Sequence, residues 1–232
     1  MNLATNAPLM TDADAPARPR AEAALPLALV ALSLIPLVSG VYRLSLLARG
    51  HTPTPDDVRI AAHPVAMALH VVGATLFCVL GALQFWPRVL RARPWLHRAL
   101  GWWLAPLGAL GALSGVWMAL HNAPHPDSSA AVVAMRVAAG GAMALCLALG
   151  VRAAVRRELG AHRAWMVRAY ALGSAAGTQS LVFVPLTLLL GQHARGSFAL
   201  GLAAGWALNV AVAEAALRRG WLRGASRSSR RP

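Results

Sequence analysis

Charged residues are scarce in this chain, and the signatures of the common enzyme classes are missing. Only 13% of the 232 residues are charged, and lysine does not occur, so that every basic residue is arginine. Globular domains average about 25% charged residues. The sequence contains no Walker loop, no dinucleotide-binding glycine fingerprint, no zinc-protease helix motif and no Cys-x-x-Cys pair. The low charge places the chain outside the range of ordinary soluble domains, and the missing motifs leave it without a signature of the common enzyme classes.

Cysteine is also rare, with only Cys78 and Cys146 present, and both fall inside apolar runs. Neither a disulfide framework nor a thiolate is easily sustained in apolar surroundings. We therefore expect both cysteines to be small packing residues.

Apolar residues make up 57% of the chain. They occur in blocks of about 20 residues, the length that a helix needs to cross a hydrocarbon core of ~30 Å. Backbone groups in lipid must be hydrogen-bonded internally, which favours helices for such runs. The sequence predicts an all-α, polytopic transmembrane bundle of about six helices, at Leu25–Leu47, Pro64–Phe85, Ala99–Leu120, Ala131–Val151, Ala164–Leu190 and Ser197–Leu217.

The arginines are distributed asymmetrically between the two sides of this predicted bundle. Of the 22 arginines, 17 fall in the two termini and in the connections between the second and third and between the fourth and fifth runs. The positive-inside bias predicts that both termini are cytoplasmic. The formal charge of +14 then reflects membrane orientation and contact with anionic lipid, so we expect no nucleic-acid partner.

The chain divides into three predicted parts. Residues 1–24 have no apolar stretch and are rich in alanine, proline and small polar residues, which predicts a disordered cytoplasmic tail. Residues 25–218 are the transmembrane helical domain, and residues 219–232 form a basic cytoplasmic tail.

Small and polar residues within the runs indicate how the helices contact one another. Glycines repeat with the spacing small-xxx-small, which permits close helix contact or a homo-oligomer through the glycine-rich faces, or leaves room for a flat cofactor ring. These pairs are Gly111 with Gly115, Gly173 with Gly177, and Gly201 with Gly205. We expect Glu214 to pair with Arg218 one turn later. We expect the polar side chains Gln84, Ser174, Thr178 and Gln179 to bond between helices.

Histidine is the residue type within the apolar runs that most strongly suggests function. His70 lies two turns, or ~10 Å, inside the run that begins at Pro64, where an ionisable side chain is costly without a partner. His121 ends the third run at the same, outer face, and the two would form an outer pair of metal ligands. The alternative for His70 is a neutral ring bonded to a backbone carbonyl or a serine.

His97 and His162 form a second set near the cytoplasmic face. Each directly precedes an arginine at the start of an apolar run, and tryptophans follow. Two imidazoles from different helices would coordinate one metal centre, and nearby arginines would neutralise haem propionates. The other interpretation is an interfacial belt that binds lipid phosphates. The candidate metal ligands are His70, His97, His121 and His162, and the candidate cofactor-binding arginines are Arg98, Arg163 and Arg168.

These residues, over about positions 64–190, resemble the bacterial membrane proteins grouped as domain of unknown function 2306. The matching positions are His70, Gln84, Phe85, His97, Arg98, Gly101, His162, Trp165, Met166, Arg168 and Tyr170. The pattern is also similar in style to multi-haem membrane cytochromes of the b561 type, which spread their axial histidines over four consecutive helices. The fourth run of this chain departs from that scheme, because it offers only Met135 and Met143.

Two functions remain open from the sequence. One is a haem b membrane protein that transfers electrons to or from a quinone or another redox partner. The other is a non-redox membrane protein, either a transporter of a small solute or protons or a structural subunit, in which the histidines and arginines bind lipid. Absorbance distinguishes the two, because haem is coloured and lipid is not.

Overall fold

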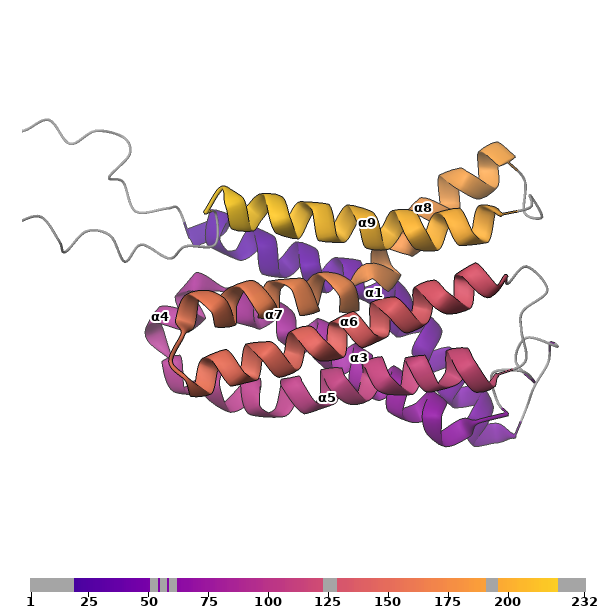
Figure 1. The fold of residues 1–232 in the computed structure, drawn as a ribbon, viewed down its shortest axis with the longest axis horizontal. Helices are drawn as coiled ribbons and strands as arrows, with labels where there is room; N and C mark the ends of the chain where they lie inside the picture. The colour runs from indigo at the N-terminus through magenta and orange to yellow at the C-terminus, as the bar shows by residue number, and fades with distance from the viewer. Residues whose placement is uncertain are drawn as a thin grey trace, which may run out of the picture.

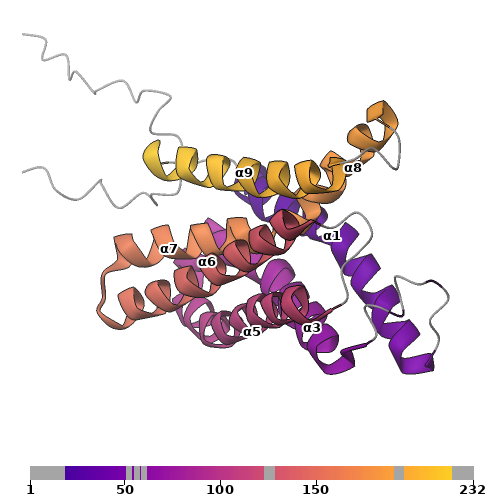
Figure 2. The same ribbon diagram turned by 45° about the vertical axis from the view of Figure 1, so that its right-hand side comes forward.

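The chain folds as a bundle of long helices in the computed structural model, which describes residues 19–50, 54, 58, 62–122, 129–190 and 196–220 (Figures 1 and 2). The elements are α1 (Pro19–Arg49), α3 (Pro64–Ala82), the short 3₁₀ helix η2 (Leu83–Phe85), α4 (Pro87–Ala92), α5 (Pro94–His121), α6 (Ala130–Val155), α7 (Leu159–Gly173), α8 (Ala175–Leu190) and α9 (Ser197–Arg218). The described residues contain no strand. Five of the described helices are long and apolar enough to cross a membrane, and α7 with α8 makes a sixth, bent span. The prediction of an all-α transmembrane bundle is confirmed.

Several helices extend beyond the apolar runs that predicted them. Helix α5 begins at Pro94, five residues before the predicted start at Ala99, and α7 begins at Leu159 instead of Ala164. Proline at the first helical position supplies a suitable backbone angle and lacks the N–H that a helix start leaves unsatisfied. Because these starts lie among arginines, hydropathy alone misplaces them. His97 and His162 therefore lie inside the first turns of their helices.

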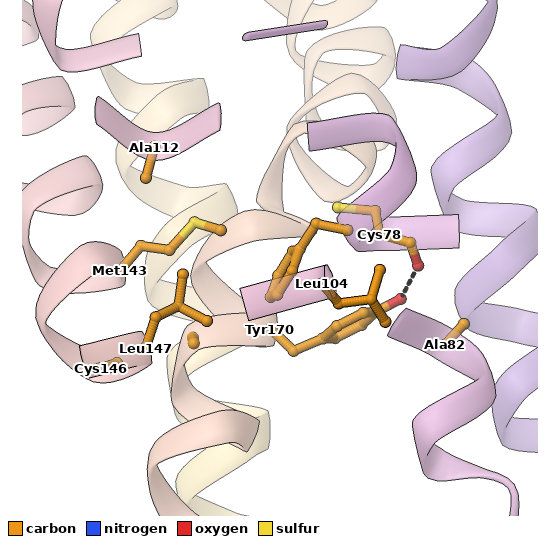
Figure 3. Close-up of a cluster of buried hydrophobic side chains, with 10 residues drawn as sticks. Cys78, Ala82, Leu104, Ala112, Met143, Cys146, Leu147 and Tyr170 are labelled. Carbon is orange, nitrogen blue, oxygen red and sulfur yellow. Dashed lines mark hydrogen bonds between the residues drawn. The ribbon is translucent and has the colours of Figure 1, made fainter. Parts of the chain in front are cut away.

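Helices α3, α5, α6 and α7 form the centre of the bundle, with α1 packed against α3 and α8, and α9 packed against α7 and α8. The largest buried cluster lies among α3, α5, α6 and α7 (Figure 3). Cys78 and Cys146 are both buried in this cluster as free thiols, which confirms their predicted packing role. Tyr170 points from α7 toward α3, where its hydroxyl donates a hydrogen bond of 2.7 Å to the Cys78 carbonyl oxygen.

Replacing Tyr170 with phenylalanine removes this interhelical hydrogen bond and keeps the ring. We expect the free energy of unfolding to fall by about 1 kcal/mol, the usual net worth of one buried hydrogen bond. Thermal unfolding in detergent measures the change. The matched control is Tyr42→Phe, since Tyr42 is 53% exposed on α1. Equal melting temperatures for the two variants would contradict the expectation.

The glycines with small-xxx-small spacing contact neighbouring helices of the same chain. Gly111 faces the backbone of Ala74, and Gly177 faces the carbonyl of Leu32. Gly115 faces the ring of His70, and the remaining three face Phe77 with Met143, Phe183 and Gln179. The expected close helix contact is confirmed. Since these glycines contact helices of the same chain, they provide no surface for a homo-oligomer.

The fifth span is not the single helix predicted at Ala164–Leu190. It is interrupted after Gly173, and its two halves, α7 and α8, meet at an angle of 41°. Asn209 of α9 supplies a hydrogen bond at the interruption, because its side-chain amide donates to the Ala171 carbonyl oxygen at 2.9 Å. The Thr178 hydroxyl donates to the Asn209 side-chain oxygen at 2.7 Å. Tertiary bonds thus replace the helical bonds lost at the bend.

Other polar side chains near this bend also bond between helices, as predicted. Asn209 donates to the Ser174 hydroxyl at 3.3 Å, and the Gln179 amide donates to the Leu202 carbonyl at 3.2 Å. Gln84 differs from them, because its side-chain oxygen is buried and has no hydrogen-bond partner among the residues that the structure describes.

Both described ends of the chain lie at one end of the bundle, together with α4 and the turn between α6 and α7 (Figure 1). We call this the arginine-rich end, since it carries Arg88, Arg91, Arg93, Arg98, Arg152, Arg156, Arg157, Arg163, Arg218 and Arg219. The gathering of these arginines at one end agrees with the asymmetry found in the sequence. Their assignment to the cytoplasmic side stays a prediction. Most of each predicted tail, residues 1–18 and 221–232, lies outside the described residues.

Candidate functional site

His97 and His162 lie next to each other at the arginine-rich end. His97 is in the first turn of α5 and His162 is in the first turn of α7. Their ring centres are 6.4 Å apart and their ring planes are nearly perpendicular, at 84°. The structure therefore brings together the two histidines that the sequence grouped as an inner set.

A backbone carbonyl orients the ring of His162. Its Nδ1 lies 2.9 Å from the carbonyl oxygen of Gly150 on α6. Since a carbonyl only accepts, Nδ1 carries the proton and Nε2 of the neutral ring keeps a lone pair. Metal-binding histidines commonly have this arrangement, in which the second ring nitrogen donates to a carbonyl or carboxylate.

His97 differs from His162, because one of its ring nitrogens has no hydrogen bond among the described residues. Its Nδ1 is buried with no hydrogen-bond partner among the described residues. One turn later on the same side of α5, a Cβ atom added at Gly101 would meet nothing within 4 Å. The surroundings of His97 thus combine an unsatisfied nitrogen with open space.

The separation of the two rings is compatible with one metal ion between them. Two metal–nitrogen bonds of ~2 Å and two ring radii of ~1 Å place imidazole centres roughly 6 Å apart when the ligands lie on opposite sides of the metal. The measured 6.4 Å is close to this value. Perpendicular planes do not prevent the geometry, because each ring can rotate about its own metal–nitrogen bond.

Of the three candidate arginines, two are exposed beside the histidines and the third has a protein partner. Arg98 and Arg163 are both exposed at the arginine-rich end. Arg168 donates two hydrogen bonds to the carboxylate of Glu214, of 2.6 and 3.1 Å, and its guanidinium lies 5.1 Å from the Trp165 ring centre. The hydrogen-bonded partner of Glu214 is thus Arg168, and the predicted pairing with Arg218 is corrected. The interaction between α7 and α9 could not be found from spacing within one helix.

His70 adopts the arrangement that the sequence left as the alternative to metal binding. Its Nδ1 lies 2.7 Å from the carbonyl oxygen of Gly111, and Ser114 donates to the same oxygen at 3.1 Å. A Cβ atom at Gly115 would lie 3.0 Å from the imidazole, so the glycine makes room for the ring. His70 thus connects α3 to α5 within the bundle.

His121 does not meet His70. Its Nδ1 donates to the Trp117 carbonyl of its own helix at 2.8 Å, and its ring stacks on the Trp117 ring with centres 4.3 Å apart. Gly111, whose carbonyl binds His70, lies ten residues earlier on α5, or ~15 Å along the helix. His63 also contacts the Trp117 ring, with ring centres 4.5 Å apart and ring planes nearly perpendicular, at 88°.

The residues that the structure describes do not form a metal site with three or more protein ligands. Over these ranges, no three histidine, cysteine, aspartate or glutamate side chains are placed to hold one ion. A site at His97 and His162 would rest on two protein ligands, the number that a porphyrin iron needs from its protein.

The positions that carry the family resemblance gather in two regions of this fold. Most lie toward the arginine-rich end, where Met166 packs on Gly150 beside His162, and Phe85 contacts Tyr170 edge to face at 4.9 Å. His70 lies apart from them. The role of the Gly150 carbonyl could not be predicted from the sequence, because a backbone atom leaves no signature in residue type.

A comparison with known protein families matches residues 67–217 to the family described as "Predicted membrane protein (DUF2306)". The chain belongs to this family. The match runs from α3 to α9 and so includes the bent span and the last helix, beyond the core of residues 64–190 suggested by the motifs. No curated protein and no solved structure matches the chain.

Proposed function

We propose that this member of the family binds one haem b between His97 and His162 and acts as an electron carrier at the arginine-rich end of the bundle. The observation that carries the proposal is the placement of two imidazoles 6.4 Å apart on two different helices. Haem iron held by two axial imidazoles exchanges one electron reversibly with a redox partner.

Several residues of the chain would contribute to haem binding. His97 and His162 would be the axial ligands, and the Gly150 carbonyl would fix the tautomer of His162. The open space at Gly101 would leave room for a flat ring against α5. Arg98 and Arg163, both exposed beside the histidines, would neutralise the two propionates. Arg168 is assigned no part in this, since it already pairs with Glu214.

The structure supports one such centre better than two. The predicted outer ligands His70 and His121 bond to separate carbonyls on α5. The transporter alternative is not favoured by the bend in the fifth span, because Asn209 and Thr178 satisfy its polar groups within the protein. In transporters, by contrast, such interruptions leave backbone groups free for substrate or ions.

The test is a reduced-minus-oxidised absorbance spectrum of the detergent-purified protein, expressed with an adequate haem supply. We expect sharp Soret and alpha bands, and we expect His97→Gly and His162→Gly to lose most of the signal because an axial ligand is removed. Adding imidazole to either variant should restore the bands, which distinguishes a missing ligand from misfolding. His121→Ala is the matched control, since His121 bonds within its own helix.

Two results would overturn the proposal. One is a colourless wild-type protein that is folded and fully supplied with haem. The other is a spectrum that both glycine variants keep unchanged. Either outcome would leave His97 and His162 as interfacial residues that bind lipid headgroups.

A further inference from the structure

The side chain of Gln84 is polar and has no role so far in the packing or in the haem site. Gln84 lies in η2, the short helix that continues α3 toward the arginine-rich end. Its side-chain oxygen is buried and accepts no hydrogen bond from the described residues. A buried carbonyl oxygen without a donor costs free energy, because it has lost its bonds to water. The position of this oxygen in the bundle therefore needs a reason.

The helical repeat shows which way Gln84 faces. Gln84 follows Phe77 by seven residues, which is two turns, so the two side chains share one face of α3 and its continuation. The Phe77 ring lies between two helices, because a Cβ atom would meet it at 2.6 Å from Gly108 of α5 and at 3.0 Å from Gly173 of α7. Gln84 thus faces the space between α5 and α7, nearer to the arginine-rich end.

The level of Gln84 along these helices follows from the same two contacts. Seven residues toward the arginine-rich end lead to Gly101 on α5 and to Met166 on α7. His97 and His162 each lie four residues farther in that direction, which is one turn, or ~5.4 Å. Gln84 therefore lies one turn deeper in the bundle than the two imidazoles and faces them from a third helix.

His97 supplies the complementary unsatisfied atom. Its Nδ1 is buried and has no hydrogen-bond partner in the described part of the chain. A neutral imidazole can donate from Nδ1, whereas the amide oxygen of glutamine only accepts. Nδ1 of His162 needs no such acceptor, because the Gly150 carbonyl oxygen lies 2.9 Å from it. One hydrogen bond between Gln84 and His97 would satisfy both buried atoms.

From these features we propose that Gln84 is a positioning residue for His97, whose Nδ1–H donates to the Gln84 side-chain oxygen directly or through one water molecule. Nε2 of His97 then keeps its lone pair for iron, as Nε2 of His162 does. The inference rests on the proposed function where it treats His97 as an axial ligand, but the hydrogen bond forms without haem. With haem bound, Gln84 would adjust the redox potential, because hydrogen bonds to a ligand change its donor strength.

The first experiment determines the tautomer of His97 in the full chain without haem. Protein labelled with ¹⁵N-histidine is studied by NMR in detergent at about pH 8, where a histidine ring is neutral, and His97→Gly identifies the His97 signals. We expect the Nδ1–H tautomer in the wild type. Gln84→Leu should weaken this preference by about tenfold, the effect of losing one hydrogen bond. Gln84→Glu should keep it, because an acceptor oxygen remains.

Gln179→Leu is the matched control, because it also removes a partly or fully buried glutamine amide, one that donates to the Leu202 carbonyl oxygen at 3.2 Å. It should lower the melting temperature and leave the His97 signals unchanged. A Gln84→Leu protein in which His97 keeps its wild-type tautomer would overturn the proposal. So would an equal change of the His97 tautomer in Gln179→Leu.

The second experiment measures the midpoint potential of the full chain after titration with haemin. A hydrogen bond that makes the imidazole a stronger donor stabilises ferric iron. We expect Gln84→Leu to raise the potential and Gln84→Glu to lower it, each by about 59 mV, a tenfold change in the one-electron equilibrium. Loss of packing alone would not shift the two variants in opposite directions, so shifts of the same sign would contradict the proposal.

The two experiments separate failure of this inference from failure of the proposed function. If the wild-type protein takes up no haemin, the proposed function fails, and the NMR signals of His97 still decide the role of Gln84. If haemin binds through both histidines and the tautomer of His97 is the same in Gln84→Leu as in the wild type, the proposed function stands and this inference fails.

Discussion

Replacing Gly73 with alanine is expected to lower the free energy of unfolding by about 2 kcal/mol, in the range seen when extra atoms are forced into a packed core. The added Cβ atom would lie 2.6 Å from the Leu107 carbonyl oxygen and 2.9 Å from the Gly111 nitrogen. Both are backbone atoms of α5, which cannot move aside as a flexible side chain would. The helices must separate, and the contacts of His70 with α5 should loosen as well.

Thermal unfolding in detergent, followed by intrinsic fluorescence, measures this effect. Gly141→Ala on α6 is the matched control, since a Cβ atom there would meet nothing within 4 Å. Alanine is favoured over glycine in helices by up to ~1 kcal/mol, so the control should be neutral or stabilising. A Gly73→Ala protein as stable as the control would show that α3 and α5 do not pack as closely as described.

Replacing Glu214 with leucine should cost about 1 kcal/mol, because the Arg168–Glu214 ion pair is lost and its side chains are only partly buried, at 32% and 29% exposure. The carboxylate accepts two hydrogen bonds from Arg168, which connect α9 to α7. We expect a lower melting temperature and a smaller yield of folded protein after extraction from the membrane.

The double variant Arg168→Met with Glu214→Leu tests the origin of this loss. Removing both charges should recover most of the lost stability, since neither partner then remains unpaired. Arg218→Met is the control for surface charge, because Arg218 is exposed at the end of α9. If Arg218→Met were as damaging as Glu214→Leu, the pairing between α7 and α9 would not be the cause.

Hydropathy and charge were sufficient to predict the number of spans and the helical class of the fold. They did not predict the bend after Gly173, because Gly173, Ser174 and Ala175 are small residues within one long, mainly apolar run. The bend depends on Asn209, which comes from another helix 38 residues after Ala171. Likewise, the spacing of Glu214 and Arg218 suggested a local pair, whereas the fold supplied Arg168 from α7.

The candidate site was predicted only in part. The similar placement of His97 and His162, each before an arginine at a helix start, correctly indicated that they lie at the same end of the bundle. The same argument placed His121 and His70 only on the same side of the membrane, and it missed that His121 lies ten residues, or ~15 Å, along α5 from Gly111, whose carbonyl binds His70. The position of His70 is decided by packing, because Gly115 admits its ring against α5.

The bend between α7 and α8 has a consequence for biogenesis. During synthesis α7 leaves the ribosome before α9, because Asn209 follows Ala171 by 38 residues, so Asn209 cannot yet serve the Ala171 carbonyl. In lipid that carbonyl needs a donor at once, and the nearest is the N–H of Ala175 in an uninterrupted helix. We therefore expect the fifth span to insert as a straight helix and to bend when the last helix packs against it.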